Sequence, residues 1–212
     1  MKIVHTVFAL VLLSVVSRAQ ESKPEDPTSL SPDKKWEFRF DSKGNPEIAR
    51  AGTTETVLQL YNICSGGPTV CKPPVWAPDS KRFAFHTRTE IRYQPTSFYQ
   101  LKGDKWEELP SAEAIGDVLD KAIAAQVKKK GRPKNIELRL ISNPIRTIRW
   151  SSPDTALVYG SMNEVEKGNV DVGFSASFLF TLKFDPTGEC KIVKTERLSE
   201  KERRKYEKDS EN

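Results

Sequence analysis

The stretch PPVWAPDSKRFAFHT, Pro73 to Thr87, decides the fold. A tryptophan precedes an Ala-Pro-Asp-Ser turn, and Phe83-Ala84-Phe85 follows it. Proline fixes one backbone dihedral of a turn, and the Asp side chain can accept hydrogen bonds from the backbone just downstream. The stretch therefore predicts a strand, a tight turn and a second strand. Its two phenylalanines should share one face and pack against a neighbouring sheet.

Two other stretches share this pattern, namely LSPDKKW, Leu30 to Trp36, and RWSSPDT, Arg149 to Thr155. Pro32 and Pro78 are 46 residues apart, and Pro78 and Pro153 are 75 residues apart. The longer interval contains a helix, and without about 30 residues of helix and flanks it resembles the shorter one. Periods of about 40 to 50 residues with several strands each are typical of propeller blades.

Short runs of aromatic and branched residues, separated by Gly, Pro, Ser, Asn and Asp, fill most of the chain. Such runs favour strands, and the separating residues favour turns. The sequence therefore predicts a mainly β domain of antiparallel sheets. We expect strands near residues 36–41, 57–62, 82–87, 97–102, 145–150, 156–160 and 173–184.

One amphipathic helix is predicted over residues 112–129. Ser111 can cap its start, three lysines occupy its last turn, and Gly131 and Pro133 end it. An apolar stripe on this helix should pack against a sheet, and it consists of Ile115, Val118, Leu119, Ala122, Ile123 and Val127.

The segment VWAPDSKRFAF resembles the TolB-type (WD40-like) β-propeller repeat, in which an aromatic residue, Ser-Pro-Asp and a basic residue precede an apolar strand. The stretch from Ser31 to Leu60 extends the resemblance: its Gly44 to Ile48 is similar to the segment between strands of that repeat, and Val57 to Leu60 to the closing strand. The resemblance covers about two thirds of the chain after residue 19 and implies about three degenerate repeats.

The pattern departs from a regular propeller in two ways. Phe38 and Phe40 are one step out of phase with Phe83 and Phe85, counted from the preceding proline, and a one-step slip reverses the buried face unless a bulge corrects it. In addition, about three repeats are fewer than the four to eight blades of closed propellers. We therefore expect an open or incomplete set of propeller-like sheets, with the inserted helix covering an edge that a further blade would otherwise cover.

Residues 1–19 have the pattern of a secretory signal peptide: Lys2, an apolar run and Ser17-Arg18-Ala19 before a cleavage site. The alternative, a membrane anchor, would need about 20 apolar residues, and the run is about ten long. We predict a secreted or periplasmic protein with no membrane span after cleavage. Residues 20–30 form a flexible leader, 31–198 a single domain, and 199–212 a charged tail that is disordered or a frayed helix.

Three cysteines remain after cleavage. The loop from Cys64 to Cys71 contains two glycines and a proline, so its ends can approach, and an exported chain meets an oxidising compartment. We predict a Cys64–Cys71 disulfide. Cys190 is left over, and the sequence leaves open whether it is buried or pairs with another chain.

No catalytic, metal or cofactor motif stands out. His86 is the one histidine outside the signal peptide and is predicted to be structural; no Gly-x-Ser-x-Gly elbow, phosphate loop or dinucleotide fingerprint occurs. The Cys64–Cys71 spacing fits no common zinc site. Lys130 to Lys134 is similar to an AT-hook, but helix-ending residues account for it equally. The formal charge of +5, or +3 without Lys2 and Arg18, does not indicate a nucleic-acid partner.

Two functions from different classes remain. The first is a non-catalytic exported protein that binds another envelope or secreted protein, as the TolB-like resemblance implies. The alternative is an accessory subunit or fragment of a propeller-gated hydrolase of the prolyl oligopeptidase type. Open strand edges invite pairing with another chain, and loops 64–74, 88–96 and 162–172 are the expected contacts. The sequence does not define the oligomeric state.

Overall fold

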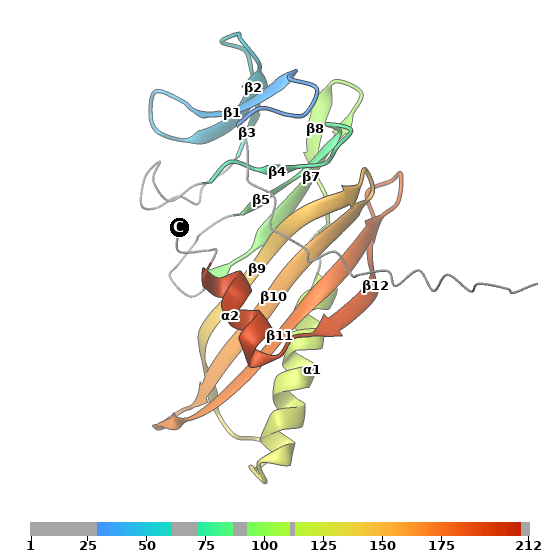
Figure 1. Cartoon of the computed structure of the whole chain (residues 1–212). Coiled ribbons are helices and arrows are strands. Elements are labelled where there is room, and N and C mark those ends of the chain that lie inside the picture. Colours follow the sequence, from blue (N-terminus) through green and yellow to red (C-terminus); the bar gives the residue numbers. More distant parts are fainter. Residues whose placement is uncertain (1–28, 61–71, 87–92, 111–112, 209–212) are drawn as a thin grey trace, which may run out of the picture.

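A computed structural model describes residues 29–60, 72–86, 93–110 and 113–208, and this part of the chain is mainly β (Figure 1). The first sheet is an antiparallel meander of β1 (Trp36–Phe40), β2 (Pro46–Arg50) and β3 (Thr56–Gln59). The middle sheet is antiparallel and contains β4 (Val75–Trp76), β5 (Arg82–His86), β7 (Thr96–Lys102) and β8 (Lys105–Glu108).

The large sheet has the order β12-β11-β10-β9-β6. Its strands are antiparallel except for β6, which pairs in parallel with β9 at one edge. Their bounds are β6 (Tyr93–Gln94), β9 (Leu138–Ser152), β10 (Thr155–Glu166), β11 (Asn169–Phe184) and β12 (Cys190–Arg197). The expected fold class, open antiparallel sheets with an inserted helix, is confirmed.

The three sheets are stacked, with the middle sheet between the other two (Figure 1). One aromatic core fills the space between the first and middle sheets and includes Trp36, Phe38, Trp76, Phe83, Phe85 and Trp106. A second core lies between the middle sheet and the large sheet and continues under the helix α1 (Glu113–Lys129). Both faces of the middle sheet are therefore buried.

The turns at Pro32 and Pro78 have the same backbone structure. The residue two positions after each proline, Lys34 or Ser80, adopts a positive φ of 60° or 59°. Equivalent hydrogen bonds close both turns: Ser31 N to Trp36 O (2.9 Å) and Lys34 N to Ser31 O (2.8 Å) in one, Ala77 N to Arg82 O (2.8 Å) and Ser80 N to Ala77 O (2.9 Å) in the other. The predicted turn and the strand after it thus occur twice, and the described residues before the turn form a strand, β4, at Pro78 and an isolated bridge, Leu30 with Glu37, at Pro32.

The third copy differs because it links two long paired strands. Thr155 pairs with Ser152, so Pro153 and Asp154 form a two-residue connection between β9 and β10. The Asp154 carboxylate accepts hydrogen bonds from Ser152 Oγ (2.5 Å) and Thr155 Oγ1 (2.9 Å). Ser31, at the equivalent position of the first copy, likewise donates to Asp33 (2.8 Å), so the serine before the proline binds the turn aspartate in both copies.

The phase difference between the first two copies has a simple cause. Phe83 and Phe85 share one face of β5, as predicted, and this face meets the first sheet, where the Phe85 and Phe38 rings are 5.7 Å apart. The middle sheet meets the first sheet with the face that carries Phe83 and Phe85, and the first sheet must answer with its own opposite face. Its aromatic residues therefore lie one position out of step with those of β5, counted from the turn proline. The one-step slip does reverse the buried face, and it does so because β1 belongs to the terminal sheet.

Helix α1 was predicted over 112–129 and is observed over Glu113–Lys129. Its buried residues Ile115, Leu119, Ile123 and Val127 pack on the large sheet beside the middle sheet. Gly160 permits this approach, since a Cβ there would lie 2.9 Å from the Phe180 ring and 3.2 Å from Ile115. The expectation that the helix covers a sheet edge is wrong: α1 packs on a face of the large sheet, against the inner strands β10 and β11.

All seven expected strand regions contain strands, although β9 and β11 extend well beyond the expected ranges. The expected strand at 57–62 is observed as β3, and its last two positions lie outside the described residues. The strand expected before the Pro78 turn is observed as β4, whereas the sequence analysis missed β2, β6, β8 and β12. The tail, expected to be disordered or a frayed helix, forms α2 (Glu200–Lys208) on the outer face of the large sheet (Figure 1).

Candidate functional site

The strand β12 lies at an edge of the large sheet and is mostly exposed. It pairs with β11 on one side, and no residue of the described ranges pairs with its other side. Ile192 and Cys190 point toward the core and are partly buried, whereas Val193 is 57% exposed. Val193 is also the extra residue of a β-bulge, since Ile192 and Lys194 pair with adjacent residues of β11.

Charged side chains line this edge. Lys194 pairs with Glu196 at 2.7 Å, Lys191 lies 3.9 Å from Glu189, and Arg197 ends the strand. Lysines and bulges on an edge strand disfavour indiscriminate pairing with other strands. The outer side of β12 thus carries charges of both signs and a bulge, features that disfavour unselective strand pairing.

The two ends of the three-sheet stack are closed by polar structure. On the outer face of the first sheet, the buried Glu47 carboxylate accepts hydrogen bonds from Arg39 Nε (2.6 Å), Thr56 Oγ1 (2.8 Å) and Gln59 Nε2 (2.9 Å). A buried carboxylate with three donors needs no further partner. Among the described residues, the Glu47 network thus makes this face polar where a further sheet would pack.

At the other end, α2 covers part of the outer face of the large sheet. Ser199 and Glu202 form a capping box, in which Ser199 N and Oγ donate to the Glu202 carboxylate at 2.8 and 2.6 Å. Tyr206 is buried and stacks on Tyr159 with ring centroids 5.5 Å apart. Arg146 donates to the Tyr206 carbonyl oxygen. One aromatic anchor and a cap thus order a segment that the sequence analysis assigned to a disordered or frayed tail.

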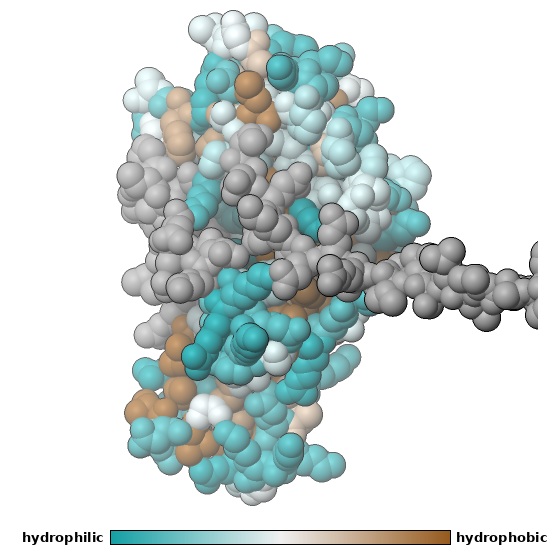
Figure 2. All heavy atoms as spheres, viewed as in Figure 1, coloured by the Kyte–Doolittle hydropathy of each residue, from teal (hydrophilic) through white to brown (hydrophobic). Residues whose placement is uncertain are grey.

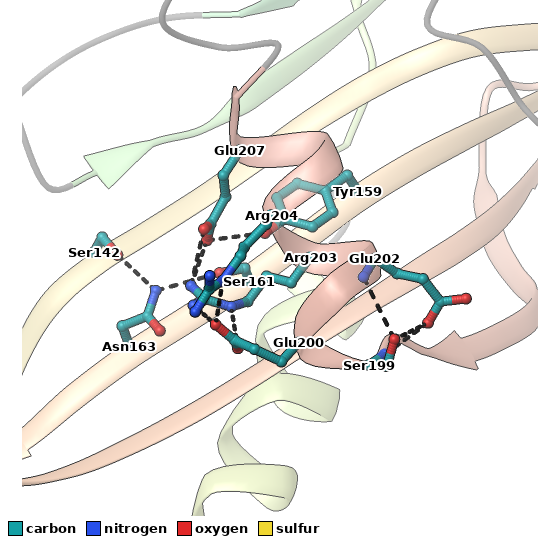
Figure 3. A network of polar contacts seen from close by, with 10 residues as sticks. All are labelled: Ser142, Tyr159, Ser161, Asn163, Ser199, Glu200, Glu202, Arg203, Arg204 and Glu207. Atoms are coloured by element: carbon teal, nitrogen blue, oxygen red, sulfur yellow. Dashed lines mark hydrogen bonds and ion pairs between the residues drawn. The ribbon is translucent and has the colours of Figure 1, made fainter.

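A polar network surrounds this anchor (Figure 3). Arg203 donates to Glu207 (2.8 and 2.9 Å) and to Glu200 (2.7 Å), and Tyr159 Oη donates to Glu207 (3.3 Å). Burial raises the pKa of the Tyr159 hydroxyl, which keeps it protonated as a donor. The network fixes α2 across the sheet and presents no arrangement of nucleophile and base.

His86 is positioned as a structural residue. Its Nδ1 lies 2.9 Å from Thr96 Oγ1, and Thr96 in turn donates to the Ile145 carbonyl oxygen at 2.5 Å. Removal of the ring from water, followed by the nearby Arg146 cation, lowers the pKa of His86 to about 4. The imidazole is therefore neutral at pH 7, and none of the hydrogen bonds given for it in the described chain involves a carboxylate.

Cys190 is a partly buried free thiol on β12 that packs against the core. Burial, and then the Glu189 carboxylate, raise the pKa of this thiol, so it is a poor nucleophile at neutral pH. Cys64 and Cys71 lie outside the described residues, as do most of loops 64–74 and 88–96, so the disulfide stays a prediction.

The other sequence candidates have structural surroundings. The AT-hook-like segment ends α1: Gly131 has a φ of 65°, and Arg132 N donates to Val127 O at 3.1 Å. Glu166 pairs with Arg132 at 3.4 Å. Within the described ranges, no group of three or more His, Cys, Asp or Glu side chains is placed to hold a metal ion.

No protein-family model matches the sequence, and no curated protein matches it. Among solved structures, the chain is similar to TolB from Acinetobacter baumannii, with 13% sequence identity and a TM-score of 0.29. The matched region covers 77% of this chain and 42% of the TolB chain. The chain thus spans less than half of that protein, and a similarity of this size carries no argument about family or function.

Proposed function

We propose that this chain is an exported, non-catalytic protein-binding component of an envelope assembly. The observation that carries the proposal is the β12 edge, an eight-residue strand with no partner on its outer side among the described residues. Such an edge can accept a strand of another protein by β-augmentation, with backbone hydrogen bonds giving affinity and side chains giving selectivity.

The surrounding structure favours this edge over the sheet faces as the contact site. The Glu47 network lies on the outer face of the first sheet, and α2 covers part of the outer face of the large sheet. A strand on the β12 edge would extend the large sheet without disturbing either of them. The predicted signal peptide supports an exported partner.

The non-catalytic part of the proposal is supported by the state of His86. A neutral imidazole that bonds to Thr96 and packs beside the Arg146 cation lacks the acid partner that a hydrolytic triad would need. The partly buried Cys190, with its raised thiol pKa, is likewise unsuited to act as a nucleophile.

Site-specific photo-cross-linking tests the binding site. A photoreactive residue is placed at Val193 on β12 or, as a control, at Lys43 in the exposed turn between β1 and β2. In the native envelope we expect a discrete cross-linked partner from position 193 and not from position 43. Equal products at both positions, or none at 193, would contradict the proposal. A hydrolase as the partner would favour the accessory-subunit alternative.

An activity screen tests the enzyme question separately. The purified chain is assayed against peptide, ester and glycoside substrates, and we expect no turnover. Turnover that persists through purification and disappears in His86→Ala would overturn the non-catalytic assignment.

A further inference from the structure

The end of the large sheet that lies farthest from the first sheet combines three segments. They are the last turn of α1, the connection to β9, and the β10–β11 hairpin (Figure 1). Direct contacts hold them together: Lys130 Nζ donates to Gly173 O at 2.7 Å, and Lys167 N donates to Glu137 O at 2.9 Å. We call this surface the basic end; its charged residues are Lys128, Lys129, Lys130, Arg132, Lys134, Glu137, Arg139, Glu166, Lys167 and Asp171.

Positive charge is in excess at the basic end after its ion pairs are formed. Glu137 pairs with Lys167 at 2.7 Å, and Glu166 pairs with Arg132 at 3.4 Å, so these two acids are already neutralised. Five exposed cations have no ion pair in the described structure: Lys128, Lys129, Lys130, Lys134 and Arg139. Of these, Lys130 donates to Gly173 O and lies over the Phe174 ring. Asp171 is the one exposed acid of the surface that remains to oppose them.

An apolar tip lies among these charges. Val170, in the β10–β11 hairpin, is 65% exposed, and Val165 and Val172 are partly exposed beside it. Figure 2 shows hydrophobic residues gathered at this end of the molecule, bordered by hydrophilic ones. A strongly exposed valine at the tip of a hairpin contributes nothing to the core, and it is the kind of residue that an interface would bury.

We propose that the basic end binds the surface of an anionic phospholipid bilayer, peripherally and reversibly. The free cations are distributed over the helix end, the connection and β9, so they suit a plane of phosphate groups better than one small anion. Val170 would enter the boundary between headgroups and acyl chains. No helix within the described residues is long and apolar enough to cross a membrane. This inference is independent of the β12 site, which lies at the other end of β11.

Vesicle co-sedimentation of the exported chain tests this inference. We expect binding to vesicles that contain phosphatidylglycerol and not to pure phosphatidylcholine vesicles, with a marked decrease as salt is raised. The combined Lys128→Gln, Lys129→Gln and Lys134→Gln variant should bind about 100-fold more weakly, since each lysine near an anionic surface contributes about a fivefold effect. Val170→Ser should weaken binding further without removing any charge.

A matched control variant carries Gln at three exposed lysines of the first and middle sheets, Lys43, Lys81 and Lys105. It removes the same net charge and should change vesicle binding less than twofold. An equal loss of vesicle binding in the control variant would show that binding depends on net charge and not on the basic end. Equal binding to neutral vesicles would show that binding does not depend on charge. Each of these two results would overturn the inference. It would also be overturned if the chain did not bind the vesicles, or if the basic end bound only an acidic protein. The cross-linking result at Val193 is unaffected by any of these outcomes.

Discussion

Replacing His86 by Gln should flatten the dependence of stability on pH between about pH 7 and pH 5. In the folded chain, removal from water and the Arg146 cation lower the pKa of His86 from 6.5 to about 4. The unfolded chain binds a proton at His86 through this range, whereas the folded chain does not. Stability that is fully present above pH 6.5 is therefore lost as the pH falls toward 4.

The size of the effect follows from the two pKa values. With 6.5 in the unfolded chain and about 4 in the folded chain, the His86 contribution falls by about 2 kcal/mol between pH 7 and pH 5. The other histidine, His5, belongs to the predicted signal peptide, so no second histidine obscures the measurement. Carboxyl groups titrate equally in both proteins and cancel in the comparison.

Urea unfolding followed by tryptophan fluorescence measures this difference, because all four tryptophans are buried. The free energy of unfolding of the wild type should fall by about 2 kcal/mol more than that of His86→Gln between pH 7 and pH 5. Thr96→Val is the matched control: it removes the partner of His86 but keeps the titrating ring, so it should be less stable at both pH values and retain the slope. Equal losses in the wild type and His86→Gln would refute the reasoning.

Three further predictions follow from single contacts. Gly160→Ala should cost about 1–3 kcal/mol in urea unfolding, because its Cβ would meet the Phe180 ring at 2.9 Å; unchanged stability would contradict this. Tyr206→Ala should release α2 and speed tryptic cleavage there while leaving the tryptophan unfolding transition in place; cleavage at the wild-type rate would show that Tyr206 is not the anchor. Mass mapping of the non-reduced exported protein should link the peptides of Cys64 and Cys71, and two free thiols would disprove the bond.

The features that sequence reasoning predicted correctly are those set by local chemistry. Proline and aspartate determine the turn after Ala77 through dihedral restriction and nearby hydrogen bonds, and alternation places Phe83 and Phe85 on one face. The length and stripe of α1, with its glycine stop, likewise depend on neighbours in the chain. None of these inferences required knowledge of which element packs on which.

The elements that were missed depend on long-range partners. The strands β8 and β12 read KWEE and CKIVKTER, and their many charged residues reflect exposed positions at sheet edges, where an apolar alternation is not required. For α2, the capping box of Ser199 and Glu202 was a visible signal. The buried anchor could not be recognised in the sequence, because Tyr206 stabilises α2 by stacking on Tyr159, which lies far away in the chain, in β10.

The sequence predicted the type of candidate site, an open strand edge, but not which strand forms it. Open strand edges were expected from an incomplete set of sheets. The expectation of a contact loop at 162–172 is wrong, because β10 and β11 continue through it and leave only the Lys167-Gly168 turn, although the segment does contain the exposed Val170. The particular edge was not predicted, since β12 was not recognised as a strand. Its selectivity depends on a bulge at Val193, which arises from its pairing with β11 and has no signature of its own in the sequence.

The out-of-phase aromatic residues explain why the stack ends after three sheets. In a closed ring each sheet would offer an apolar face to both neighbours, as the middle sheet does here with Phe85 on one side and Phe98 on the other. The first sheet has Phe38 on its inner face and Glu47 on its outer face, and burying Glu47 under another sheet would add desolvation without adding a hydrogen bond. On the large sheet, the outer position is taken by Tyr206 and the polar helix around it. Growth by stacking is therefore disfavoured at both ends of the described stack, which agrees with the proposed contacts being lateral ones, along the β12 edge and at the basic end.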